Sequence, residues 1–146
     1  MTVAPVPEGY ATLTPYLVVP DPLALFAFLT AALGASEVRR TSLPDGTVFN
    51  IEARIGGSMV MLVQGRPGHL ARSAALYVYV PDVDAAYAQA VATGGVSTMA
   101  PQDQFYGDRG AGFRDPAGND WWLATRIENL SSEELARRAA ARLSAR

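Results

Sequence analysis

The spacing of apolar side chains in the first half of the chain predicts one strand, one helix and three further strands. Residues 13–19 alternate and are rich in β-branched side chains, as half-buried strands are. Asp21 followed by Pro22 is a typical helix start, and apolar residues then recur at helical spacing until Gly34, a typical helix end. Turn residues separate the segments that follow. The predicted order is a strand at 13–19, a helix at 22–33, and strands at 37–42, 47–55 and 58–64.

The same order recurs 61 residues further along the chain. Asp21 aligns with Asp82 at this offset, which also pairs Gly34 with Gly95 and continues without a gap into the last strand. The second copy predicts a strand at 75–80, a helix at 83–93, a loop over 101–110 that runs into a strand near 109–114, and a strand at 120–125. We therefore expect two tandem βαβββ units, at about 13–64 and 74–125, within a single domain that spans 1–146.

A third element follows the second unit. Ser131 and Glu134 have the spacing of a capping box, and Leu135, Ala139 and Leu143 then recur at helical spacing between arginines. This pattern predicts an amphipathic C-terminal helix at about 131–144, packed on the domain or on a partner.

Composition excludes several kinds of chemistry. The 146-residue chain contains no cysteine and no lysine, and His69 is its one histidine, so thiol, Schiff-base and multi-histidine sites are excluded. His69 is expected to be an exposed linker residue. A net charge of −2 gives no electrostatic basis for binding nucleic acid. No apolar run approaches the roughly 20 residues of a membrane span, and no signal peptide is evident, so we expect no membrane partner and a cytoplasmic location.

The repeat and one turn together resemble a known family. Two βαβββ copies with the turn Asp115-Pro116-Ala117-Gly118-Asn119 before the last strand resemble the vicinal oxygen chelate superfamily, which includes glyoxalase I, extradiol dioxygenases and bleomycin-resistance proteins. Segments 15–19, 103–109 and 121–125 are similar to its PhnB-like, glyoxalase-like branch. The resemblance implies an α+β fold whose two units form a curved open barrel around a cleft. It also implies a homodimer.

The resemblance further implies where a metal would bind. Enzymes of the superfamily take ligands to a divalent metal from the first and last strand of each unit. The corresponding positions here are Thr14, Met61, Ala75 and Trp122. None of them offers imidazole or carboxylate, so we expect neither a bound metal nor another cofactor.

Strand alternation predicts what lines the cleft instead. Tyr16, Tyr77 and Tyr79 share a face with the metal positions, whereas Trp121 faces the helices. The loop 103–109 could cover a ligand and supply a charge clamp from Asp108 and Arg109. Aromatic and thioether side chains suit a planar or apolar organic molecule. The predicted ligand-binding residues are Tyr16, Met61, Tyr77, Tyr79, Phe105, Tyr106, Arg109 and Trp122.

Two functions stay open on this basis. The first is a binding protein of the bleomycin-resistance kind that sequesters a planar or apolar metabolite or antibiotic. The second is a metal-independent lyase or isomerase, with Asp120, Glu52 or the Asp108–Arg109 pair as acid and base. The facing of the strand that carries Glu52 and Asn50 is ambiguous from sequence. In both cases the partners are a small organic ligand and a second copy of the chain.

Overall fold

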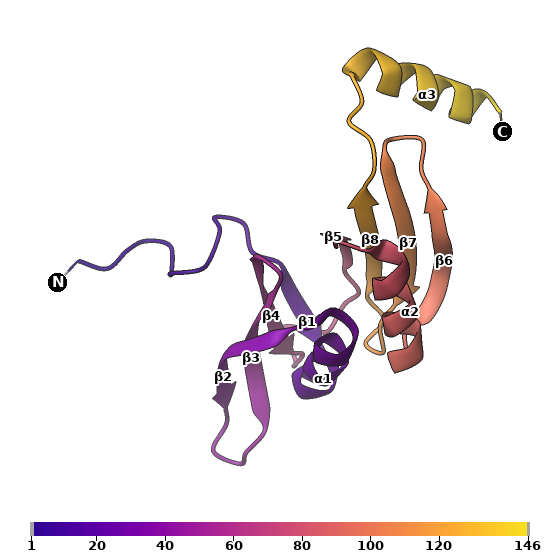
Figure 1. Cartoon of the computed structure of the whole chain (residues 1–146). Coiled ribbons are helices and arrows are strands. Elements are labelled where there is room, and N and C mark those ends of the chain that lie inside the picture. The colour runs from indigo at the N-terminus through magenta and orange to yellow at the C-terminus, as the bar shows by residue number, and fades with distance from the viewer. Residues whose placement is uncertain (1, 146) are drawn as a thin grey trace.

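Two tandem units and a C-terminal helix make up the fold (Figure 1). The computed structural model describes residues 2–145, which form eight strands and three helices. Their bounds are β1 (Tyr16–Val19), α1 (Pro22–Leu33), β2 (Ser36–Ser42), β3 (Val48–Ile55), β4 (Ser58–Gln64), β5 (Ala75–Tyr79), α2 (Val83–Thr93), β6 (Val96–Asp103), β7 (Asp108–Arg114), β8 (Asp120–Arg126) and α3 (Ser132–Ser144).

Each unit folds into its own four-stranded sheet. Sheet 1 has the order β1-β4-β3-β2 and sheet 2 the order β5-β8-β7-β6. The first and last strands of each unit pair in parallel, and the other neighbours are antiparallel. Tyr16 lies opposite Met61 in sheet 1, and Tyr77 lies opposite Trp122 in sheet 2. Because the partners in the second pair are each 61 residues after those in the first, the predicted repeat of two βαβββ units is confirmed.

The alignment of the two units at an offset of 61 residues is interrupted, however. Helix α1 has 12 residues and ends at Gly34 with φ 69°, whereas α2 has 11 and ends at Gly94 with φ 121°. Gly94 rather than Gly95 is therefore the counterpart of Gly34, and the predicted pairing is wrong at this point. Both glycines adopt the positive φ that ends a helix without a Cβ penalty. A longer turn before β8 restores the offset.

The predicted loop over 101–110 is also wrong. Strand β6 continues to Asp103 and β7 begins at Asp108, so residues 104–107 alone connect them. Pro101 made the segment look like a loop, because proline cannot donate to a ladder. Here it lies on an edge strand, inside a register shift between Met99 and Gln102. Edges and bulges are the places in a sheet that tolerate proline.

The two helices lie between the two sheets and complete one core. Gln89 of α2 donates its Nε2–H to the carbonyl oxygen of Ala31 in α1, at 3.0 Å. The Trp121 and Phe113 rings stack with an interplanar angle of 3°. The predicted helix-facing side chains are in one buried cluster, which includes Leu17, Val19, Val60, Leu62, Trp121 and Leu123. The opposite face of each open sheet consequently points away from this core.

The turn before β8 is held by one buried carboxylate. Asp115 accepts hydrogen bonds from the backbone N–H groups of Ala117 and Asn119, from the Asn119 amide, and from Nε1–H of Trp121 at 2.7 Å. Asn119 in turn accepts one from the Ala74 N–H, at 2.9 Å. The turn thus fixes a core tryptophan and the end of the linker, which explains these residue types without any ligand.

Helix α3 begins as predicted, because the Ser131 hydroxyl accepts the Glu134 N–H at 3.1 Å. The Glu134 carboxylate bonds to Arg137 and Arg138, and Arg138 also pairs with Glu128 at 2.9 Å. The ion pair with Glu128 therefore joins the helix to the segment that follows β8, while Leu135 and Leu143 stay exposed. Within residues 2–145, none of the helices is long and apolar enough to span a membrane.

Candidate functional site

The predicted site residues divide between two separate surfaces. Tyr16 and Met61 lie on the outer face of sheet 1, and Tyr77, Tyr79 and Trp122 lie on the outer face of sheet 2. Since the inner faces of both sheets share one core, these outer faces point away from each other. One chain does not bring the two groups together, so each face has to be considered by itself.

The outer face of sheet 2 contains a hollow of about 330 Å³, at the lower end of the range for small-molecule pockets. Its back is one cross-strand row, in which Met99, Gly112, Trp122 and Tyr77 follow each other across β6, β7, β8 and β5. Gln104 and Tyr106, from the loop 104–107, complete the lining. The hollow therefore combines aromatic rings with a few polar atoms.

Trp122 forms a flat wall of this hollow because its neighbour is a glycine. A Cβ atom on Gly112 would lie 2.9 Å from Cζ3 and 3.0 Å from Cε3 of Trp122. The six-membered ring of the indole thus rests on the backbone of β7. With 37% of Trp122 exposed, much of the ring is open to a partner.

A buried carboxylate organises the tyrosines beside this wall. Tyr77 donates its hydroxyl to Oδ2 of Asp108 at 2.7 Å, and Tyr79 donates to the same oxygen at 3.1 Å. The phenols reach Asp108 from β5 by crossing β8, where Ala124 leaves room. Burial raises the pKa of Tyr77, and the hydrogen bond to Asp108 and the neighbouring Tyr106 hydroxyl raise it further. Tyr77 therefore keeps its proton at neutral pH.

The other carboxylate oxygen of Asp108, Oδ1, has the guanidinium of Arg126 as its charged neighbour. Nε of Arg126 lies 3.2 Å from Oδ1, but this oxygen accepts no aligned hydrogen bond from residues 2–145. Asp108 is 1% exposed, whereas half of the Arg126 side chain is in solvent. The two tyrosine hydroxyls are thus the principal hydrogen-bond donors to this carboxylate.

The predicted clamp of Asp108 with Arg109 does not form. Adjacent residues of a strand face opposite ways, and Arg109 turns to Asp84, which it binds at 2.8 and 3.0 Å, and to Asp103 at 2.9 Å. Phe105 packs edge-on against Tyr106, with 5.2 Å between ring centroids. Of the predicted loop residues, only Tyr106 lines the hollow in the described chain.

The outer face of sheet 1 carries a different arrangement. Tyr16 lies 3.0 Å from Nε2 of His69 through its hydroxyl, with the rings edge-to-face. His69 is half-buried by this contact, so the expectation of a freely exposed linker residue is wrong. Glu52 lies opposite Met61, which resolves the facing of β3 and places the carboxylate on the same face.

Glu52 is buried by the N-terminal segment. Tyr10 donates its hydroxyl to Oε1 of Glu52, and Nε of Arg39 donates to Oε2 at 2.7 Å. Arg39 and Tyr10 hold the pKa of Glu52 below its usual range, while burial and the hydrogen bond to Glu52 raise the pKa of Tyr10 to about 12. The Glu52 carboxylate is thus ionised, its charge is balanced by Arg39, and the N-terminal segment shields it from solvent.

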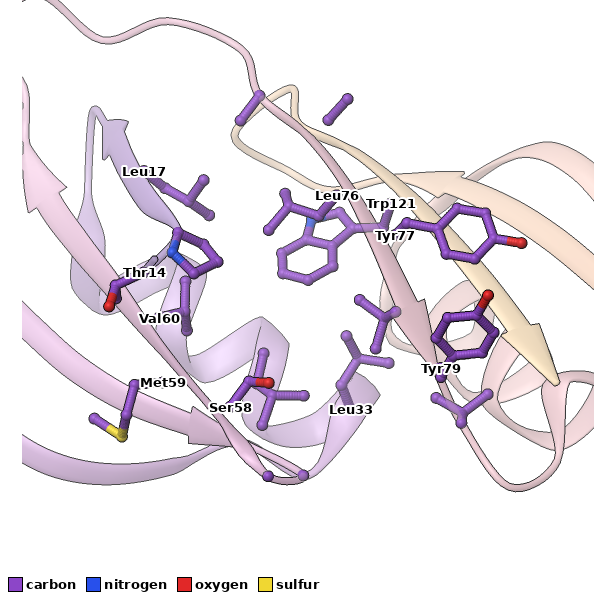
Figure 2. A pocket seen from close by; sticks show the side chains of 18 of the residues that line it. Thr14, Leu17, Leu33, Ser58, Met59, Val60, Leu76, Tyr77, Tyr79 and Trp121 are labelled. Carbon is purple, nitrogen blue, oxygen red and sulfur yellow. The ribbon is translucent and has the colours of Figure 1, made fainter. Parts of the chain in front are cut away.

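A larger cavity, of about 760 Å³, lies elsewhere, between the two units (Figure 2). Its wall is mostly apolar, with Trp121, Val60 and Leu76 pointing inward. The phenols of Tyr77 and Tyr79 point away from it, beyond β5. Because this cavity continues the helix-facing core and offers few polar side chains, we place the candidate site in the smaller hollow on sheet 2.

The four metal positions do not fit a divalent metal. Ala75 has no donor atom, the Trp122 indole can only donate, and the Thr14 hydroxyl donates to the Ala11 carbonyl oxygen at 3.4 Å. Met61 supplies only a soft thioether. Within the described residues, His, Asp and Glu side chains do not gather in threes as a metal site requires. No step through a metal is therefore derived.

Sequence reasoning missed the residues that shape the hollow. Gly110 and Gly112 lie on the site face of β7, and their alternation in Gly110-Ala111-Gly112 was the available signal. Met99 and Gln104 gave none, because no strand was predicted over 96–100 and Gln104 lay in the predicted loop 101–110. Tyr10 lies in a segment without secondary structure, so periodicity could not place it.

Comparisons with known proteins agree with this architecture. The family model described as the Glyoxalase/Bleomycin resistance protein/Dioxygenase superfamily matches residues 10–123. An uncharacterized protein of Mycobacterium bovis is 30% identical over 134 residues, which cover 84% of this chain and 88% of the relative.

Solved structures share the fold at lower identity. TioX from a Micromonospora species is 24% identical with a TM-score of 0.70, over 80% of this chain and 99% of that one. TnmS3, an antibiotic binding protein from a Streptomyces species, is 21% identical with a TM-score of 0.64, over 86% and 98%. The chain therefore belongs to the glyoxalase, bleomycin resistance protein and dioxygenase superfamily, as its repeat and turn predicted.

Proposed function

We propose that this protein binds a planar organic molecule without chemical conversion, in the hollow on sheet 2, with Trp122 as the stacking wall. The observation that carries the proposal is the contact of the Trp122 ring with Gly112 beside a hollow that Tyr77, Gln104 and Tyr106 also line. TnmS3, which shares the fold, is described as an antibiotic binding protein. Membership of the PhnB-like branch and a cytoplasmic location stay predictions.

The shape and chemistry of the hollow suit a flat ring system. An aromatic face exposed beside a shallow depression gains from offset stacking, in addition to the apolar area that it buries. Met99 adds a polarizable sulfur that adapts to ring edges. The ligand class proposed is consequently a planar aromatic metabolite or antibiotic.

The metal-independent enzyme is the second candidate, and the carboxylates argue against it. Asp120 is paired with Arg114 at 3.0 Å, and Glu52 is held by Arg39 and Tyr10. A carboxylate base that works near neutral pH needs a raised pKa, whereas the pKa of Glu52 is lowered. Mass spectrometry of a bound ligand after long incubation separates the two functions, because turnover changes the ligand's mass and binding does not.

We also propose that the functional form is a homodimer. Tyr16 and Tyr77 are 48% and 46% exposed on faces that point away from each other, so a second copy is needed to cover them. A symmetric partner would place the sheet 1 face of one chain over the sheet 2 face of the other. Light scattering at micromolar concentration should give twice the mass of the chain, and a monomer alone would contradict the proposal.

Substitution of Trp122 tests the binding proposal. An aromatic anchor is typically worth about 2 kcal/mol on truncation, so Trp122→Ala should weaken binding about thirtyfold. Trp122→Phe should recover much of the loss. Trp121→Ala is the matched control, because its ring is 1% exposed in the core and its loss should lower the melting temperature rather than affinity. Unchanged affinity in a folded Trp122→Ala variant would reject Trp122 as a stacking wall.

The natural ligand can be sought directly. Native mass spectrometry of protein purified from its own host should reveal a co-purifying molecule of the proposed class. Its aromatic absorbance would then identify the ring system against which the variants are measured.

A further inference from the structure

The direction of the hydroxyl protons beside the hollow is fixed by Asp108. A carboxylate can only accept hydrogen bonds, so Tyr77 and Tyr79 must both donate to it. Tyr77 also lines the hollow. With its proton committed to Asp108, the Tyr77 hydroxyl can offer only an oxygen lone pair to a ligand.

Tyr77 cannot reverse this direction at little cost. If it donated to a ligand instead, Oδ2 of Asp108 would keep only the longer bond from Tyr79, at 3.1 Å. The other carboxylate oxygen already lacks an aligned hydrogen bond from residues 2–145. A buried charged group that loses a partner is strongly destabilised. Protonated Tyr77 is therefore a persistent acceptor.

The remaining polar side chains of the hollow, Gln104 and Tyr106, can accept a hydrogen bond from a ligand, although each also carries a donor. One Nε2–H of Gln104 points to Sδ of Met99 at 3.6 Å, which leaves the second N–H and the amide oxygen of Gln104 for a ligand. Burial keeps the Tyr77 proton in place at neutral pH, in agreement with its raised pKa. Tyr77 thus differs from Gln104 and Tyr106, because its proton is committed to Asp108 and its oxygen can only accept.

We propose that the hollow selects planar aromatic ligands that carry a hydrogen-bond donor on the ring edge, such as a phenol or an aromatic amine, and disfavours aromatic carboxylates. The inference rests on the proposed function, because it assigns a ligand class to the same site. A ligand donor meets the Tyr77 oxygen, whereas a carboxylate would place its own negative oxygens against that lone pair and near Asp108.

Three probes that share one ring system test the selection by titration calorimetry at pH 7. 2-Naphthol carries a donor, 2-methoxynaphthalene carries only an acceptor, and 2-naphthoate is an anion. One net hydrogen bond corresponds to about fivefold in affinity, so 2-naphthol should bind about fivefold tighter than 2-methoxynaphthalene. 2-Naphthoate should bind about tenfold weaker than 2-naphthol. Equal affinities of the three probes, within twofold, would overturn the inference.

Two variants assign the selection to Tyr77. Tyr77→Phe should remove the preference for 2-naphthol over 2-methoxynaphthalene while both probes still bind. Tyr79→Phe is the matched control, because it removes the second donor to Asp108 but leaves the lining of the hollow intact. Retention of the preference in Tyr79→Phe supports a direct role of Tyr77. Persistence of the preference in Tyr77→Phe would overturn it.

This experiment distinguishes failure of the proposed function from failure of the proposed selection for ligand donors. If 2-methoxynaphthalene binds and Trp122→Ala removes its binding, the proposed function holds and only the ratios between probes decide the inference. If none of the three probes binds in a Trp122-dependent manner, the proposed function fails and the inference fails with it.

Discussion

The outer faces of the two sheets occupy equivalent positions of one repeated fold, yet their side chains differ in chemistry and in how far they are covered. Tyr16 and Met61 pair across sheet 1 just as Tyr77 and Trp122 pair across sheet 2. On sheet 1 the N-terminal segment covers Glu52, whose carboxylate accepts the Tyr10 hydroxyl, while Tyr16 stays exposed. On sheet 2 the face is open.

The neighbour across the ladder accounts for much of this difference. Met61 lies opposite Glu52, whereas Trp122 lies opposite Gly112. A charged side chain on the first face needs partners and a cover, because an isolated buried charge is costly. A glycine on the second leaves space that an indole can lie over. Two copies with the same backbone pairing therefore differ in the chemistry of their outer faces through the residue opposite the last strand.

Two turns held by an aspartate, the buried one before β8 and an exposed one between β2 and β3, should show the largest difference between the units. In Asp115→Ala, four donors, including the Trp121 indole, lose a buried acceptor. We expect a loss of about 4 kcal/mol in the free energy of unfolding, because each buried unpaired polar group costs on the order of 1–3 kcal/mol and the donors partly relax. Urea unfolding followed by circular dichroism measures it.

An exposed turn of sheet 1, between β2 and β3, provides a control in which the aspartate caps a turn in solvent. Asp45 accepts a hydrogen bond from the Thr47 N–H at 2.9 Å in solvent, so Asp45→Ala should cost less than about 1 kcal/mol. Similar losses in the two variants would mean that burial of Asp115 does not stabilise the second unit.

Substitution of Gly112, in the cross-strand row at the back of the hollow, should have the next largest effect. A Cβ at Gly112 would come within 2.5 Å of Oγ1 of Thr98 and 2.9 Å of the Trp122 ring, so Gly112→Ala should cost about 2 kcal/mol and move the indole. The measurements are thermal melting and tryptophan fluorescence.

Gly110 on the same strand is the matched control for this substitution. A Cβ there meets its nearest atom, the Leu123 carbonyl oxygen, at 3.5 Å, an ordinary contact. Gly110→Ala should leave the tryptophan emission unchanged. The same spectral shift in both variants would show that the indole does not depend on Gly112.

The smallest expected effect concerns the hydrogen bond by which Tyr10, in the N-terminal segment, covers Glu52 on the outer face of sheet 1. Tyr10→Phe removes the hydroxyl bonded to Glu52 and should cost about 1 kcal/mol at neutral pH. Because the folded pKa of Tyr10, about 12, exceeds the ordinary value near 10, its contribution is complete below pH 10 and is lost as pH rises through 12.

Unfolding measured from pH 7 to 12 checks this dependence. The difference between the native protein and the variant should shrink only above pH 10. In a spectrophotometric titration, Tyr10→Phe should lack one tyrosine that ionises near pH 12. A constant difference across the whole range would contradict the assigned hydrogen bond.

The fold could be predicted much further than the site. Periodicity, helix ends and the repeat depend on local chemistry, so α1, α2 and α3 were placed within a residue or two of their observed bounds. Alternation also assigned Trp121 to the core and Trp122 to the outer face. Pro101 was misread because only the tertiary position of β6, at an edge, makes proline acceptable there.

The site depends on relations that a linear pattern does not contain. Whether Arg109 or Arg126 approaches Asp108 is decided by which face of β7 and β8 each residue takes, and the segment had no secure register. That the two outer faces point apart follows from both helices sharing one core. Neither fact could be obtained from spacing within one strand.

The position of β8 between β5 and β7 has a consequence for how the protein is made. A growing chain that has left the ribosome up to β7 holds α2 and the β6–β7 hairpin, but β5 has no strand to pair with. Pairing that spans tens of residues closes slowly, and it begins here only when the Asp115 turn reverses the chain. The surface around Trp122 is thus expected to be the last part of sheet 2 to form during synthesis, because it is complete only when β8 is inserted between β5 and β7.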